Sequence, residues 1–190
     1  MTTRTPTLAD SLWSESLVRN ILLVVGGSLA LIISAKVQVP WWPVPMTMQT
    51  FMVLVIGMSF GWRLGALTVI AYLAQGALGL PVFANSPERG IGLAYMAGPT
   101  GGYLVGFALA AMVTGWLAER GFDRSIPRAT VALIAGVLAI YIPGVLYLGA
   151  LIGFDKPLLS LGVAPFLPAE VFKVALAAAV LPFAARIARR

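Results

Sequence analysis

Four long stretches of this 190-residue chain contain no charged residue: 37–62, 64–87, 90–118 and 129–154, each more than twenty residues long. Because a helix rises 1.5 Å per residue, about 20 apolar residues cross the hydrocarbon core of a bilayer. Each stretch can therefore form a membrane-spanning helix. Residues 20–35 and 174–185 are shorter apolar segments that reach spanning length when flanking polar side chains extend to the interface. The sequence thus predicts six spans.

The charges between the spans alternate in a way that predicts the topology. Three basic residues, Lys36, Arg89 and Lys156, fall on one side of the membrane, and Lys173 falls inside the last span. The positive-inside rule assigns the richer side to the cytoplasm, so both termini are expected there. The nine basic residues of that side are Arg4, Arg19, Arg63, Arg120, Arg124, Arg128, Arg186, Arg189 and Arg190.

The composition excludes several classes of protein. Hydrophobic residues make up 59% of the chain and charged residues 11%, whereas soluble domains have about 25% charged residues. The net charge of +6 therefore indicates topology and not a nucleic-acid partner. The chain has no cysteine, which excludes disulfides, and no histidine, and Glu170 alone is acidic within a span. We expect no metal site.

The expected fold is an all-α integral membrane protein with a single transmembrane domain over residues 1–190. Residues 1–17 form a cytoplasmic segment, either a short amphipathic helix on the membrane surface or a disordered tail. Pro143 and Gly144 predict a kink in the fifth helix. The six helices are expected at about 18–36, 46–60, 62–79, 100–118, 128–153 and 168–186.

Two motifs that suggest enzymes lack their partners. Residues 57–61 match the G-x-S-x-G pattern of serine hydrolases, but without histidine the usual triad cannot form, so helix packing and a tight turn are favoured. Residues 98–103 are rich in glycine, but no lysine follows a glycine as a Walker A loop requires. We expect no catalytic residues and no nucleotide site in this chain.

Polar side chains gather in the predicted outer half of the membrane and in the outer loop after the third helix. Such groups, drawn from several helices and walled by Trp41, Trp42 and Phe83, indicate an outward-opening pocket. Alternatively, they only hydrate the outer interface. The polar residues are Gln49, Gln75, Tyr103, Tyr147, Glu170 and Lys173 in the helices, and Asn85, Arg89 and Tyr95 in the loop.

Glu170 and Lys173 carry the most weight because an ionised side chain within a membrane is costly, about 2.5–3.5 kcal/mol at its centre. Their spacing of three places them on one helix face. Either they pair only with each other, or they offer a hydrogen-bond acceptor and a cation to a ligand.

Small residues at a spacing of four occur in the first helix, at Gly26, Ala30 and Ser34. Such a stripe allows another helix to approach closely. The spacing alone does not say whether that helix belongs to this chain or to a partner.

Four motifs, in this order, resemble the BioY family of biotin-specific substrate-binding subunits (S components) of energy-coupling factor (ECF) transporters. They are VPMTMQT at 44–50, GLPVF at 79–83, GPTGGY at 98–103, and PFLP at 165–168 shortly before Glu170 and Lys173. The resemblance implies a six-helix protein of the bacterial cytoplasmic membrane that captures biotin from outside. It also implies a transmembrane coupling subunit and cytoplasmic ABC-type ATPases, which hydrolyse the ATP.

The resemblance also implies roles for residues. Gly26, Ala30 and Ser34 would contact the coupling subunit. Glu170, where the family more often has aspartate, would accept a hydrogen bond from a ureido N–H of biotin, and Asn85 would complement the same ring. Lys173 and Arg89 would hold the carboxylate. Gln49 and Tyr95, with Trp41, Trp42 and Phe83, would line the pocket.

Two other functions remain open from the residues. One is a self-sufficient secondary carrier for a small carboxylate, with Glu170 as a proton relay. The other is a membrane-embedded hydrolase that uses Ser59, against which the missing histidine argues.

Overall fold

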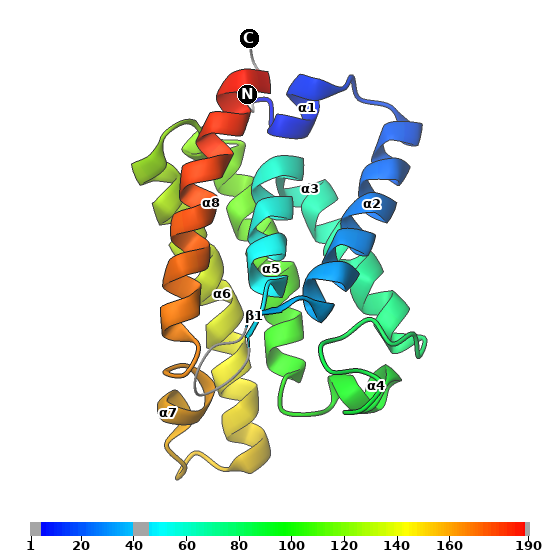
Figure 1. Cartoon of the computed structure of the whole chain (residues 1–190), viewed down its shortest axis with the longest axis vertical. Coiled ribbons are helices and arrows are strands. Elements are labelled where there is room, and N and C mark those ends of the chain that lie inside the picture. The colour runs from blue at the N-terminus through cyan, green and yellow to red at the C-terminus, as the bar shows by residue number, and fades with distance from the viewer. Residues whose placement is uncertain (1–4, 40–45, 189–190) are drawn as a thin grey trace.

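The computed structural model describes residues 5–39 and 46–188, which form a bundle of helices (Figure 1). Within these residues, five helices are long and apolar enough to cross a membrane: α2, α3, α5, α6 and α8. The helices are α1 (Leu8–Leu12), α2 (Leu17–Lys36), α3 (Gln49–Ala77), α4 (Gly92–Met96), α5 (Gly101–Ala118), the 3-10 turn η1 (Phe122–Arg124), α6 (Ile126–Ile152), α7 (Leu158–Gly162) and α8 (Leu167–Ala188); the strands are β1 (Gln38–Val39) and β2 (Met46–Thr47).

Helix α3 consists of two segments that fold back on each other at Gly61. This glycine has φ 81° and ψ 173°, a backbone conformation that other residues rarely adopt. Gly57 and Gly65, one on each side of the turn, pack closely: a Cβ added at Gly65 would lie 3.1 Å from the Gly57 Cα. Farther along, Gln49 Nε2 donates to Tyr72 Oη at 2.7 Å, although a straight helix would separate these residues by about 35 Å. The G-x-S-x-G pattern therefore lies in a helix end and its turn.

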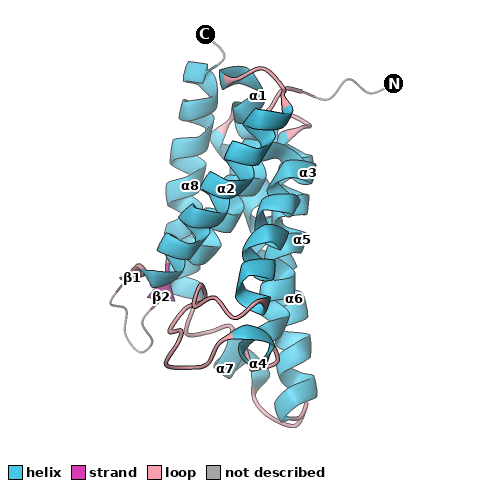
Figure 2. Ribbon diagram, turned by 90° about the vertical axis from the view of Figure 1, so that its right-hand side faces the viewer, coloured by secondary structure: helices cyan, strands magenta, loops and turns pink. Residues whose placement is uncertain are grey.

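The expected helices at 46–60 and 62–79 correspond to these two segments, but the first begins three residues later than expected. Met46 and Thr47 instead pair with Val39 and Gln38 in an antiparallel β1–β2 ladder. The ladder is not part of the all-α expectation. Figure 2 shows it beyond the end of α2, toward the end of the bundle that carries α4 and α7. Elsewhere the bounds of α2, α5, α6 and α8 lie within two residues of those expected, and α6 continues through Pro143.

The two ends of the bundle differ in content. Both termini and α1 lie at one end, whereas α4 and α7 lie at the other (Figure 1). Helix α5 packs against α3 on one side and against α6 on the other. Glycines allow the closest of these contacts: at Gly106, a Cβ would lie 2.7 Å from the Ile140 Cα of α6. The core thus consists of α3, α5 and α6, with α2 and α8 packed on its sides.

Helix α2 packs mainly against α3 and leaves a wide apolar face uncovered. Gly27 faces α3, where a Cβ would lie 2.6 Å from the Thr68 Cγ2. Within a membrane such an apolar face contacts lipid or another helix. Its exposed side chains are Leu17, Val18, Ile21, Leu22, Val25, Leu29 and Ile33.

Candidate binding cavity

A cavity of about 530 Å³ opens at the end of the bundle that carries α4 and α7. Helices α3, α5, α6 and α8 contribute to its wall, together with the loops around α4 and α7. Its volume falls in the range of pockets that hold small organic molecules. All six residues predicted to bind the ligand line it: Gln49, Asn85, Arg89, Tyr95, Glu170 and Lys173.

A closed polar triangle joins α3 to α8 inside the cavity. Lys173 Nζ donates to Glu170 Oε1 at 2.9 Å and to Thr50 Oγ1 at 2.8 Å, and Thr50 Oγ1 donates to Glu170 Oε1 at 2.8 Å. Glu170 and Lys173 are each only 4% exposed. Glu170 lies in the first turn of α8, where the helix dipole favours a negative charge. The pairing that the sequence left open as one of two alternatives is therefore observed, with Thr50 as a third member.

The second carboxylate oxygen of Glu170 has no partner in the part of the chain that the structure describes. Glu170 Oε2 is buried and makes no hydrogen bond with any residue that the structure describes. A buried polar atom without a partner is costly, by about 1–3 kcal/mol, and calls for a physical explanation. Because Glu170 lines the cavity, a ligand that donates a hydrogen bond would satisfy this oxygen.

The loop between α3 and α4 supplies two further polar side chains, Asn85 and Arg89, and helix α4 supplies a third, Tyr95. Asn85 has φ 54°, a left-handed conformation in which asparagine is enriched, and its Oδ1 accepts from Gln38 Nε2 at 2.6 Å. The exposed guanidinium of Arg89 has no hydrogen bond or ion pair with the described residues. Tyr95 Oη donates to Ala84 O at 2.9 Å. Burial raises the pKa of the Tyr95 hydroxyl, with smaller opposing effects of Thr100 and Arg89, so the hydroxyl stays protonated.

Some predicted lining residues lie elsewhere. Phe83 is fully buried and stacks on Tyr95 from behind, with ring centroids 4.7 Å apart. Gln75 donates to Ser28 Oγ at 3.1 Å and so connects α3 to α2. Tyr147 donates to Ala97 O at 2.9 Å, whereas Tyr103 does line the cavity. Trp41 and Trp42 lie outside the described residues.

Sequence reasoning missed Thr50, Gln38 and Tyr141, which also line the cavity. Thr50 directly follows the predicted Gln49 in the same motif, and this neighbouring position is the signal that could have identified it. Gln38 precedes the proline-rich segment. Tyr141 lies in a mostly apolar helix, and the sequence does not show which face of that helix points toward the cavity.

The three small residues of α2 do not share one exposed face. Gly26 is exposed, with no atom within 4 Å of its Cβ position, and Ala30 is half-buried. Ser34 is buried, and its hydroxyl donates to Leu31 O at 2.8 Å. Gly26 is therefore the member of the stripe that is most open to another chain.

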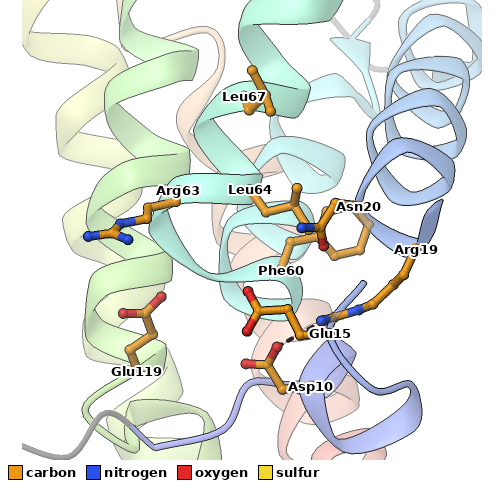
Figure 3. A pocket seen from close by; sticks show the side chains of 9 residues that line it. All are labelled: Asp10, Glu15, Arg19, Asn20, Phe60, Arg63, Leu64, Leu67 and Glu119. Atoms are coloured by element: carbon orange, nitrogen blue, oxygen red, sulfur yellow. Dashed lines mark hydrogen bonds and ion pairs between the residues drawn. The ribbon is translucent and has the colours of Figure 1, made fainter. Parts of the chain in front are cut away.

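A smaller hollow of about 230 Å³ lies at the end with the termini (Figure 3). Arg19, only 2% exposed, donates to Asp10 Oδ1 at 2.9 Å, which connects α1 to the start of α2. Asp10 also accepts from Thr7 N at 3.1 Å in a capping box that begins α1. Residues 1–17, expected as a surface helix or a tail, therefore include a helix fixed to the bundle.

No group of three histidine, cysteine or acidic residues within 5–39 and 46–188 could hold a metal ion. The polar groups of the cavity are instead suited to an organic molecule that has hydrogen-bond donors at one end and a negative charge at the other.

The model of the BioY family matches residues 3–190. The chain belongs to the BioY family. Similar members include the biotin transporter BioY of Rhodobacter capsulatus, 38% identical over 178 residues that cover 82% of this chain and 87% of that protein. The BioY of Thermotoga maritima is 37% identical over 150 residues, which cover 79% and 86%. A probable biotin transporter of Pyrococcus horikoshii is 37% identical over 145 residues, which cover 76% and 83%.

A solved structure has the same fold. It is the crystal structure of the S-component for biotin from an ECF-type ABC transporter, with a TM-score of 0.72 and 22% identity. The match covers 91% of this chain and 92% of that one. This BioY member therefore shares the helical architecture of that structure.

Proposed function

We propose that this BioY protein takes up biotin across the membrane as the substrate-capture subunit of an ECF-type transporter. The similar proteins of the family are named as biotin transporters, which supports this function. It acts by binding and transport, not by catalysis. The observation that carries the proposal is Glu170 Oε2, which has no partner among the described residues and lies in a mostly apolar cavity.

Biotin's chemistry matches this cavity from end to end. Its ureido ring has two N–H donors and one carbonyl acceptor, its bicyclic body is apolar, and its tail ends in a carboxylate. Glu170 Oε2 accepts one ureido N–H, while Asn85 complements the same ring. Arg89, whose guanidinium is unpaired within the described residues, holds the carboxylate through charge-assisted hydrogen bonds.

The proposed role of Lys173 differs from that of Arg89, because two of the three N–H donors of Lys173 already bind Glu170 and Thr50. Because its ammonium group lies 2.9 Å from Glu170 Oε1, its remaining donor faces the ureido end of the ligand, and the carboxylate is left to Arg89. Gln49 and Tyr95 form part of the wall around the bicyclic rings.

The proposed topology has six crossings, with the two segments of α3 each crossing once and both termini in the cytoplasm. The reversal at Gly61 supports the sixth crossing. The excess of basic residues in alternate connections supports the orientation, which opens the cavity to the outside of a bacterial cytoplasmic membrane.

The proposed partners are a transmembrane coupling subunit and cytoplasmic ABC-type ATPases that hydrolyse ATP. Gly26 and Ala30 of α2 are the proposed contacts with the coupling subunit, and Ser34 contributes through packing behind them. The exposed apolar face of α2 supports this assignment, as does the absence of a Walker A motif from the sequence.

Calorimetric titration of the purified protein with biotin tests the proposal. We expect saturable one-to-one binding, weakened at least tenfold when the carboxylate of biotin is replaced by an amide. Equal binding of the two ligands would contradict the role of Arg89. Biotin uptake by vesicles that contain this chain alone, driven by a proton gradient and independent of ATP, would instead favour a secondary carrier.

A further inference from the structure

The last turn of α2 is fixed to the loop that carries Asn85. Lys36 Nζ donates to Phe83 O at 2.9 Å, to Ser86 O at 2.6 Å and to Ser86 Oγ at 3.0 Å. Three oxygen atoms therefore use all three donors of this ammonium group. Its position at the C-terminus of α2 is also one where the helix dipole favours a positive charge.

These contacts hold the backbone on both sides of Asn85. Phe83 and Ser86 are buried, and Ser86 Oγ in turn donates to Phe83 O at 2.7 Å. Asn85 lies between them with its left-handed φ of 54° and is itself exposed to the cavity. A non-glycine residue keeps a left-handed backbone conformation only when the surrounding structure holds it there.

A second contact from the same segment sets the direction of the Asn85 amide. Gln38 Nε2 donates to Asn85 Oδ1 at 2.6 Å. The amide of asparagine has an accepting oxygen and a donating nitrogen. Since Gln38 occupies the oxygen, the NH₂ group remains for the cavity, where no described residue accepts from it.

We propose that Lys36 and Gln38 are positioning residues that make Asn85 a hydrogen-bond donor toward an acceptor atom of the ligand. If the ligand is biotin, as the proposed function on which this step rests states, the acceptor is its ureido carbonyl oxygen. Glu170 then recognises the N–H edge of the ureido ring and Asn85 its oxygen. In this role both positioning residues act through Asn85.

Hydrogen exchange of the ligand-free protein tests the positioning independently of biotin. We expect the amides of residues 83–89 to exchange at least tenfold faster in Lys36→Met than in wild type. Lys156→Met is the matched control, because Lys156 is exposed and its ammonium group pairs with the neighbouring, exposed Asp155. Unchanged exchange of this loop in Lys36→Met would overturn the inference, whatever the protein binds.

Titration with biotin, and with the analogue that has sulfur in place of the ureido oxygen, tests the role of Gln38. Wild type is expected to prefer biotin at least tenfold, because sulfur is a weaker acceptor. Gln38→Glu can only accept, so Asn85 must turn its NH₂ group toward residue 38 and its oxygen toward the ligand. The preference for biotin should then fall to less than threefold; an unchanged preference would overturn the inference.

A double-mutant cycle separates positioning from general stability. Lys36→Met should weaken biotin binding about tenfold in wild type but less than twofold in the Asn85→Ala background, because its effect passes through Asn85. Fully additive losses would overturn the positioning role. Failure of wild type to bind biotin would refute the proposed function, while the exchange experiment would still decide whether Lys36 holds the loop.

Discussion

Glu170 and Lys173 form an ion pair of 2.9 Å in which one carboxylate oxygen binds the ammonium group and the other has no partner in residues 5–39 and 46–188. The pair thus stabilises the junction of α3 and α8 through Thr50 and still offers an acceptor to the cavity. Its two oxygens have separate tasks, one structural and one directed at the ligand.

Glu170→Gln keeps the side-chain size and removes the charge. We expect biotin affinity to fall at least tenfold, because a neutral amide accepts less strongly and can turn its NH₂ group toward the ureido N–H. The variant should also lose about 3 kcal/mol of stability, since Lys173 stays buried without its counter-ion. Titration and thermal unfolding in detergent measure the two effects. Exposed Glu88→Gln is the control, and an equal response of both variants would contradict the assignment.

Gly115→Ala should destabilise the turn of α3. A Cβ at this position would lie 2.4 Å from the backbone of Gly61 and Trp62, so the helices must separate. We expect a loss of about 1–3 kcal/mol in thermal unfolding. Gly26→Ala is the matched control because its Cβ meets no atom within 4 Å, and it should not destabilise the protein. Equal melting temperatures for the two variants would argue against the close α3–α5 contact.

Gly26→Leu should weaken the complex with the coupling subunit and leave biotin binding unchanged. A Cβ at Gly26 would meet no atom within 4 Å, so the added side chain extends from an open position of α2 toward the proposed partner. Co-purification with the coupling subunit, together with biotin titration, measures the two effects. Val131→Leu on the exposed face of α6 is the control. Normal assembly of Gly26→Leu would remove this glycine from the interface.

Asp10→Asn should release α1 from the bundle. The buried Arg19 would lose a charge-assisted partner, and its Nε already has no hydrogen bond with the described residues (Figure 3). We expect a loss of about 1–3 kcal/mol in thermal unfolding and faster proteolysis of residues 5–16. Glu15→Gln is the control, because Glu15 lines the same hollow but is exposed. Biotin affinity should not change, since the hollow and the cavity lie at opposite ends.

The sequence predicted the helices well because the membrane imposes a simple requirement on them. A charge-free run of sufficient length must form a helix in lipid, and Arg63 divides one long apolar region into the two segments of α3. The candidate site residues could be chosen from the sequence because ionisable and amide groups are rare in such runs, and all six line the cavity. Glu170 and Lys173 therefore stood out against their surroundings.

The partners of these residues were not predictable. Thr50 and Glu170 are 120 positions apart, and Gln38 and Asn85 are 47 apart, so their contacts depend on how the helices pack. The differing exposure of the small residues in α2 has a geometric reason. A spacing of four advances about 40° around a helix, so Ser34 turns inward although Gly26 points outward.

Helix α2 is bound near both ends, through Arg19 to α1 and through Lys36 to the loop of Asn85. A displacement of this helix by a neighbouring subunit would therefore move a wall of the ligand cavity. Thermodynamic linkage then requires reciprocity: if docking changes the affinity for biotin by some factor, bound biotin changes the affinity of docking by the same factor. Vitamin capture and subunit assembly are, on this account, two coupled equilibria that share one helix.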